Sequence, residues 1–211
     1  MFVSILVLTL FFVIYGVIHS LLAGLPVKNW TRRTFGPNVD RWYRLFYNIV
    51  AVVTFLPLFP LLALLPDQTL YVVPAPWRWL MLAGQLLALA GLGLAFLQTE
   101  PLHFLGLTQL WTKPAATEAN GRLVVTGFYY WVRHPLYFFS MLFLWLTLAM
   151  TVNLLVTYLL ISLYFYVGSI YEERRLLAEF GPAYRAYQRC VPRLIPWRGR
   201  CYNPQTSWET S

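Results

Sequence analysis

Long apolar runs limit most strongly how this chain can fold. Nearly uncharged stretches lie at 1–23, 45–65, 78–98, 136–151 and 154–170. A backbone inside a bilayer must satisfy its own hydrogen bonds, and continuous rather than alternating apolar sequence favours helices. Only 11% of the residues are charged, against about 25% in a soluble domain. The sequence therefore predicts an all-α integral membrane protein with about five transmembrane helices.

The last two runs are shorter than a full membrane span. As a helix, residues 136–151 would measure roughly 24 Å at ~1.5 Å per residue, less than the ~30 Å apolar core. We therefore expect a tight helical hairpin over 136–170, split at Thr151-Val152-Asn153. The first run has no basic start, which favours a retained span over a signal peptide. Pro57 and Pro60 are expected to kink the second span.

Positive charges predict the orientation of the chain. All but one of the 16 lysines and arginines fall in 24–44, 99–135 and the tail from 171; the exception is Arg78. With five spans these segments share one side, which the positive-inside rule makes cytoplasmic. The N-terminus is then outside and the C-terminus cytoplasmic. The net charge of +8 is thus explained by orientation and contact with membrane lipid, and nucleic acid is not expected as a partner.

The 99–135 loop and the C-terminal tail flank the last hairpin, so they should meet as a cytoplasmic layer. We divide the chain into an N-terminal three-span membrane region, 1–98, and a core of loop, hairpin and tail, 99–211. Cys190 and Cys201 suggest neither a disulfide framework nor a close ligand pair, so no metal site is expected.

Two groups of charged residues border this hairpin. Arg133 and His134 precede Pro135, a residue suited to the first helical position, where free N–H groups attract anions. Interfacial snorkelling of a basic pair is the alternative. Glu172 and Glu173 end the fifth span, where carboxylates oppose the helix dipole; they are either hydrogen-bond acceptors for a ligand or part of a solvated cluster.

Other residues are ordinary when taken one at a time. Gly181-Pro182 should restart a short helix that carries Tyr184 and Tyr187 along the interface. Gln109 lies on a short amphipathic stretch, and Gly127 would permit close approach of the backbone to a ligand. His19 lies within the first span, where it is either functional or hydrogen-bonded to a neighbouring helix.

Together these residues form a specific pattern. It comprises Gly127, Tyr129, Arg133-His134-Pro135-Leu136-Tyr137, Glu172-Glu173, Leu176, Phe180-Gly181, Tyr184, Tyr187 and Val191-Pro192. This order resembles the isoprenylcysteine carboxyl methyltransferase superfamily, which includes membrane phospholipid methyltransferases. The bacterial methanethiol S-methyltransferase branch is the most similar overall, and it implies a bacterial inner membrane location.

The resemblance implies an S-adenosyl-L-methionine site in the cytoplasmic layer. The implied cofactor-binding residues are Gln109, Gly121, Arg122, Leu123, Val124, Tyr129, His134, Pro135, Leu136, Tyr137, Glu172 and Glu173. His134, with Arg133, would hold the cofactor carboxylate, and Glu172 its hydroxyls or ammonium. Tyr129 and Tyr137 would offer aromatic faces to the sulfonium.

The expected acceptor is a small or lipophilic molecule that enters from the bilayer or the cytoplasm. A thiol is the first choice, because Gly168 stands where isoprenylcysteine enzymes carry a substrate arginine. An isoprenylcysteine carboxylate and a phospholipid amine are the alternatives. His103 is either a substrate-side base or a structural histidine, and the candidate catalytic residues are Arg133, His134, Glu172 and His103. A non-catalytic membrane assembly factor or carrier is the rival from another class.

Overall fold

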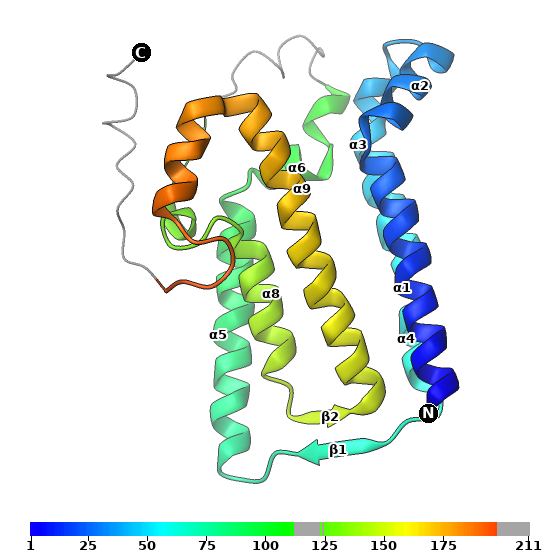
Figure 1. The fold of residues 1–211 in the computed structure, drawn as a ribbon, viewed down its shortest axis with the longest axis vertical. Helices are drawn as coiled ribbons and strands as arrows, with labels where there is room; N and C mark the ends of the chain where they lie inside the picture. The colour runs from blue at the N-terminus through cyan, green and yellow to red at the C-terminus, as the bar shows by residue number, and fades with distance from the viewer. Residues whose placement is uncertain (112–122, 124, 198–211) are drawn as a thin grey trace. The chain divides into compact units, whose positions relative to one another are not determined.

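The computed structural model describes residues 1–111, 123 and 125–197, which are mainly helical (Figure 1). Four helices are long and apolar enough to cross a membrane: Phe2–Ala23, Val39–Leu64, Trp77–Leu97 and Val152–Cys190. The all-α membrane class is thus confirmed. Pro135–Trp145, in place of the expected 136–151, has only 11 residues, or roughly 16 Å. The number of membrane crossings therefore stays a prediction.

Short helices and two short strands connect the long helices. In chain order the elements are α1 (Phe2–Ala23), α2 (Leu25–Phe35), α3 (Val39–Phe55), α4 (Leu58–Leu64), β1 (Thr69–Val72), α5 (Trp77–Leu97), α6 (Pro101–Leu105), η1 (Thr108–Leu110), η2 (Gly127–Tyr130), α8 (Pro135–Trp145), β2 (Ala149–Thr151) and α9 (Val152–Cys190).

Contacts group the chain into two compact units. The first contains Met1–Val72, Thr99–Asn120 and Ala149–Leu160; the second contains Val73–Gln98, Gly121–Leu148 and Ile161–Ser211. These units do not test the predicted division into residues 1–98 and 99–211, which stays a prediction.

In the first unit, a side-chain hydrogen bond joins α1 and α3. The ring of His19 on α1 is hydrogen-bonded to the hydroxyl of Tyr47 on α3, which confirms the neighbouring-helix alternative. The expected kink at Pro57 is also confirmed, since α3 ends at Phe55 and α4 begins at Leu58, whereas Pro60 lies in the first turn of α4.

The expected turn at Thr151-Val152-Asn153 is replaced by a short sheet. Residues 149–151 form β2, which pairs antiparallel with β1 instead of extending the preceding helix. The Val152 N–H donates to the Gln68 carbonyl (2.9 Å), and the Asn153 N–H donates to Asp67 Oδ1 (3.0 Å). These partners satisfy N–H groups that the first turn of α9 leaves free.

In the second unit, α5 and α8 pack side by side through small residues (Figure 1). Gly84, Ala88, Gly91 and Ala95 lie on one face of α5. A Cβ at Gly84 would lie 2.8 Å from Leu146 Cδ1, and one at Gly91 would overlap the Phe139 ring. Small residues thus allow the two backbones to approach closely, as is common between membrane helices.

The long helix α9 bends at Gly181. This glycine has φ 55° and ψ −125°, and Pro182 follows it, so the expected helix restart is confirmed. Tyr184 and Tyr187 on the restarted segment are buried with Val125 and Val191. The segment therefore packs as the core of this part of the second unit.

The packing of α5 against α8 can be tested with two glycines on the same helix. Gly91→Ala should lower the free energy of unfolding by about 1–3 kcal/mol, because the Phe139 ring is held by Phe128 and Phe138 and cannot move freely. Gly93→Ala is the control, since its Cβ would meet open space and alanine favours helix by about 0.5–1 kcal/mol. Thermal unfolding in detergent measures both; equal melting temperatures would contradict the close packing.

Candidate active site

The site begins where α8 starts. Pro135 is the first residue of α8, as expected, and the side chain of the preceding His134 makes no capping hydrogen bond to this helix end. The Arg133 N–H donates to the Pro192 carbonyl (2.9 Å) and the His134 N–H to the Arg193 carbonyl (3.2 Å). The segment before α8 therefore meets the tail, as the sequence predicted for these two segments.

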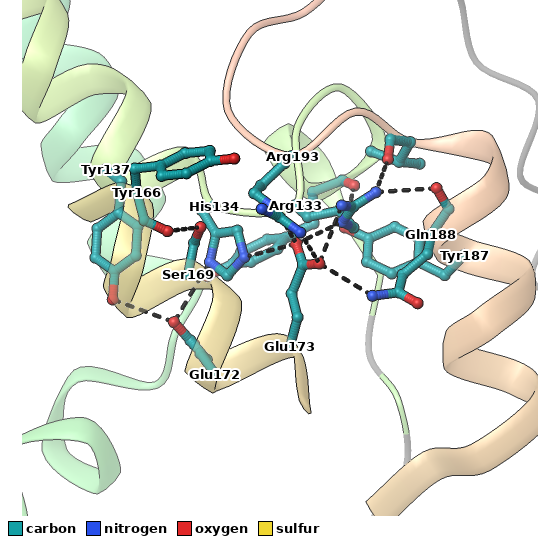
Figure 2. Close-up of polar contacts among 12 residues, drawn as sticks. Arg133, His134, Tyr137, Tyr166, Ser169, Glu172, Glu173, Tyr187, Gln188 and Arg193 are labelled. Carbon is teal, nitrogen blue, oxygen red and sulfur yellow. Dashed lines mark hydrogen bonds and ion pairs between the residues drawn. The ribbon is translucent and has the colours of Figure 1, made fainter. Parts of the chain in front are cut away.

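Glu173 is a buried carboxylate that binds several donors (Figure 2). Arg133 donates from Nε to Oε1 at 2.8 Å and from Nη2 to Oε2 at 3.1 Å. Arg193 makes the same two hydrogen bonds from its own Nε and Nη2, each at 3.1 Å. Gln188 Nε2 donates at 3.0 Å and His134 Nε2 lies at 3.1 Å. Such a saturated carboxylate joins α9, the start of α8 and the tail, and it has little capacity left for a ligand.

Arg133 extends the same network to the end of α9. Its Nη1 donates to the carbonyl of Gln188 at 2.9 Å and also to the carbonyl of Val191. These carbonyls belong to the last turn of the helix and the residue after it, where backbone acceptors lack helical partners. The Arg133 guanidinium thus donates both to free backbone carbonyls at the end of α9 and to the buried carboxylate of Glu173.

Glu172 differs from its neighbour although both belong to α9. Its side chain is 48% exposed, against 4% for Glu173. The Tyr137 hydroxyl donates to Glu172 Oε2 at 3.1 Å, and His134 Nδ1 lies 3.4 Å from the same oxygen (Figure 2). The other carboxylate lone pairs face outward and could bind a ligand.

His134 lies between the two carboxylates, and its two ring nitrogens are not equivalent. Nε2 has a good hydrogen-bond distance to Glu173, whereas 3.4 Å from Nδ1 to Glu172 is long. Burial lowers the pKa of His134, but the hydrogen bonds and charges of Glu172 and Glu173 outweigh it and raise the pKa above 6.5. The geometry thus favours an imidazolium that is anchored through Nε2, with Nδ1 held only by the long contact to Glu172, which an incoming anion can replace.

Aromatic residues surround this pair. The Tyr137 ring stacks with the His134 ring (centroids 5.3 Å apart) and with the Phe165 ring (4.7 Å). Because its ring already has stacking partners, Tyr137 offers a ligand chiefly its hydroxyl. Burial, with a smaller contribution from the Glu172 charge, raises the pKa of Tyr129 to about 12, so this phenol stays neutral.

Gly127 has a different role from the one expected. Its φ is 54°, and the space in front of its Cα is filled by the Gln98 side chain, whose Oε1 accepts from the Phe128 N–H (3.2 Å). The absence of a side chain thus serves a contact with α5 rather than close approach of the backbone to a ligand.

The remaining predicted residues divide into three groups. Leu136 lies in the first turn of α8, and Leu123 packs on the tyrosine cluster of the second unit. Gln109 and His103 belong to the first unit, where Gln109 Nε2 lies 3.3 Å from His103 Nδ1. Gly121, Arg122 and Val124 lie outside the described residues. The assignment of all these residues to a cofactor or catalysis stays a prediction.

Two residues of the network were missed by the sequence analysis. Arg193 directly follows Val191-Pro192, the end of the recognised pattern, and Gln188 lies within it. Arg174 and Arg175 directly follow the Glu172-Glu173 pair and were the expected compensating charges, so only the richness of the tail in arginine could have signalled a further partner. The sequence alone did not identify which of the many tail arginines is that partner.

Comparisons with known proteins agree with the motif resemblance. Residues 25–191 match the family described as "Protein of unknown function (DUF1295)". Methanethiol S-methyltransferase 2 of Bradyrhizobium diazoefficiens is 33% identical over 92% of this chain and 73% of its own length. The methanethiol S-methyltransferases of Mycobacterium tuberculosis (32%) and Crocosphaera subtropica (30%) each match 89% of this chain, over 76% and 72% of their lengths.

The chain therefore belongs to the DUF1295 family and is related to these membrane-branch methyltransferases, and the resemblance inferred from its motifs is confirmed. No solved structure matches it.

The two neighbouring glutamates should respond differently to substitution. Glu173→Gln leaves the nearly buried Arg133 and the partly exposed Arg193 without a carboxylate and should destabilise the protein by about 3–5 kcal/mol. Glu172→Gln keeps its hydrogen-bond acceptor at a half-exposed position and should change stability by less than about 1 kcal/mol. Thermal unfolding of both variants in the same detergent checks this order, and similar losses would contradict the division of roles.

The contribution of His134 to stability should depend on pH. A raised pKa in the folded protein means that the imidazolium contributes fully below the ordinary pKa of about 6.5 and loses its contribution as pH rises through the folded value. The melting temperature of wild type should therefore exceed that of His134→Gln most at pH about 5.5–6, with the gap narrowing at higher pH. A gap that is constant, or that widens with pH, would exclude a charged His134.

Proposed function

We propose that this protein is an S-adenosyl-L-methionine-dependent membrane methyltransferase whose acceptor is a small thiol. The observation that carries the site is the half-exposed Glu172 next to His134, which Glu173 anchors at the start of α8. Family membership supports the reaction class, because the relatives are named methanethiol S-methyltransferases.

The residues fit the amino-acid end of such a methyl donor. A zwitterion needs a donor for its carboxylate and an acceptor for its ammonium, close together. His134 Nδ1 and the uncapped start of α8 can supply the donors, and Glu172 can supply the acceptor, with its orientation fixed by the Tyr137 hydroxyl. When bound, the sulfonium supplies an activated methyl group.

The proposed role of the protein is to bind and orient rather than to transfer protons. Methyl transfer requires the acceptor sulfur in line with the methyl carbon, so fixed positions matter more than acid–base chemistry. Glu173 holds His134 Nε2, which leaves the ring a single orientation toward Glu172. A thiol with pKa about 8.5 is partly ionised at neutral pH, and partial exclusion of water favours a reaction that consumes opposite charges.

The other acceptors remain alternatives under the same proposal. Gly168 lies on α9 one turn before Glu172, and a Cβ there would lie 4.0 Å from the Tyr137 hydroxyl with no closer neighbour. This position carries no charge to hold a carboxylate acceptor, which favours an uncharged or weakly acidic one. His103 as a base stays a proposal, and its Nδ1 already faces Gln109 and Thr108.

The decisive experiment is methyl transfer from labelled S-adenosylmethionine to a panel of small thiols, isoprenylcysteines and phospholipids. We expect a methyl thioether from the small thiols. In bacterial membrane vesicles the donor should work only when the cytoplasmic face is outward, as the distribution of positive charge predicts. A methyl ester or methylated lipid as the main product would instead favour an alternative acceptor.

Binding of S-adenosylhomocysteine tests the site itself. Glu172→Ala and His134→Ala should each weaken binding by at least about tenfold, which corresponds to the loss of one hydrogen bond to a charged group. Glu179→Ala, which removes an exposed carboxylate later on α9, is the matched control and should bind like wild type. Calorimetry that finds no binding to wild type would favour the non-catalytic rival.

A further inference from the structure

The tail and the late part of α9 line a concave surface beside the Glu173 hydrogen-bond network. This feature, called the tail groove below, has a volume of about 420 Å³. Its lining consists of Arg133, Tyr166, Gln188, Arg189, Val191, Pro192, Arg193, Leu194, Ile195 and Trp197. Glu172 and Tyr137 are not part of this lining, so the tail groove is distinct from the proposed ligand position.

The tail groove carries excess positive charge. Its described lining contains three arginines and no carboxylate. Arg133 and Arg193 share the single charge of Glu173, which neutralises only one of them. Arg189 is exposed and has no ion pair among the residues that the structure describes. The groove therefore offers an uncompensated site for an anion.

Apolar and aromatic surface continues from the groove along α9. Tyr166 lines the groove and is 50% exposed, and the Arg193 guanidinium lies over its ring, 5.7 Å from the centroid. Leu163 and Val167 share the same helical face and are also exposed. At the other edge, Ile195 and Trp197 are exposed as well. Exposed tyrosine and tryptophan beside arginine are typical of the head-group level of a membrane.

We propose that the tail groove binds the head group of an anionic phospholipid. The phosphate would lie at Arg189 and the outer side of Arg193, since guanidinium groups match phosphate oxygens. An acyl chain would follow Leu163 and Val167 along the apolar part of α9. Continuity with a membrane-crossing helix favours a lipid over a soluble anion or a peptide. This inference goes beyond the proposed methyl transfer and does not depend on it.

The test uses the full chain in neutral detergent with phosphatidylglycerol or phosphatidylcholine added. Phosphatidylglycerol should raise the melting temperature of wild type more than phosphatidylcholine does, and native mass spectrometry should detect retained lipid. Arg189→Gln should weaken retention by about tenfold, because it removes one charged hydrogen-bond donor. Arg185→Gln is the matched control, since Arg185 lies one turn earlier on the same helix and does not line the tail groove; it lines a neighbouring concavity, to which Arg189 also contributes.

Each outcome of this test is informative. If Arg189→Gln loses the bound phosphatidylglycerol and Arg185→Gln keeps it, the result supports a lipid site in the tail groove. Equal losses in both variants would indicate attraction by overall charge and overturn it. Inorganic phosphate that reproduces the whole shift would identify a soluble anion as the ligand instead. Trp197→Ala should reduce retention of the lipid without affecting any response to inorganic phosphate. The reason is that Trp197 would contact the apolar part of the lipid, whereas the arginines would bind its phosphate.

Discussion

A buried carboxylate shared by two arginines is the interaction on which this site depends. Taking Glu173 out of water is costly unless its charge and its lone pairs are compensated. Arg133, Arg193, His134 and Gln188 supply that compensation from three parts of the chain: the start of α8, the late turns of α9 and the tail. Because all four donors meet at this one carboxylate, these three segments are fixed relative to one another.

This arrangement explains why two adjacent glutamates have separate roles. Successive residues on a helix point about 100° apart, so only one of the pair can face the arginines. Glu173 does so and becomes structural, while Glu172 points toward the Tyr137 hydroxyl and Nδ1 of His134. His134 touches both, and it links the rigid network to the side chain with free acceptor capacity. In the proposed function, the buried network holds the groups that would bind the donor.

Much of the fold could be predicted because membrane burial leaves a clear mark in the sequence. The apolar runs predicted the long helices, and Pro57, Pro135 and Gly181-Pro182 marked helix ends and a bend. The stretch at 146–151 was predicted less well, since β2 forms only because β1, distant in sequence, is available to pair with it. Apolar content alone does not distinguish the end of a helix from a strand that follows it.

For the site, the sequence by itself determined which residue types gather near the last hairpin: the Arg133-His134-Pro135 start of α8, the Glu172-Glu173 pair and the tyrosines. Those assignments follow from local rules, since proline favours a first turn and charges are excluded from the apolar spans. Only the tertiary structure decided that Glu173 is buried and Glu172 exposed, that Arg193 completes the network, and that Gln98 fills the space at Gly127. The physical reason is that hydrogen-bond partners and burial depend on how α9 is rotated against segments far away in sequence, which no local pattern encodes.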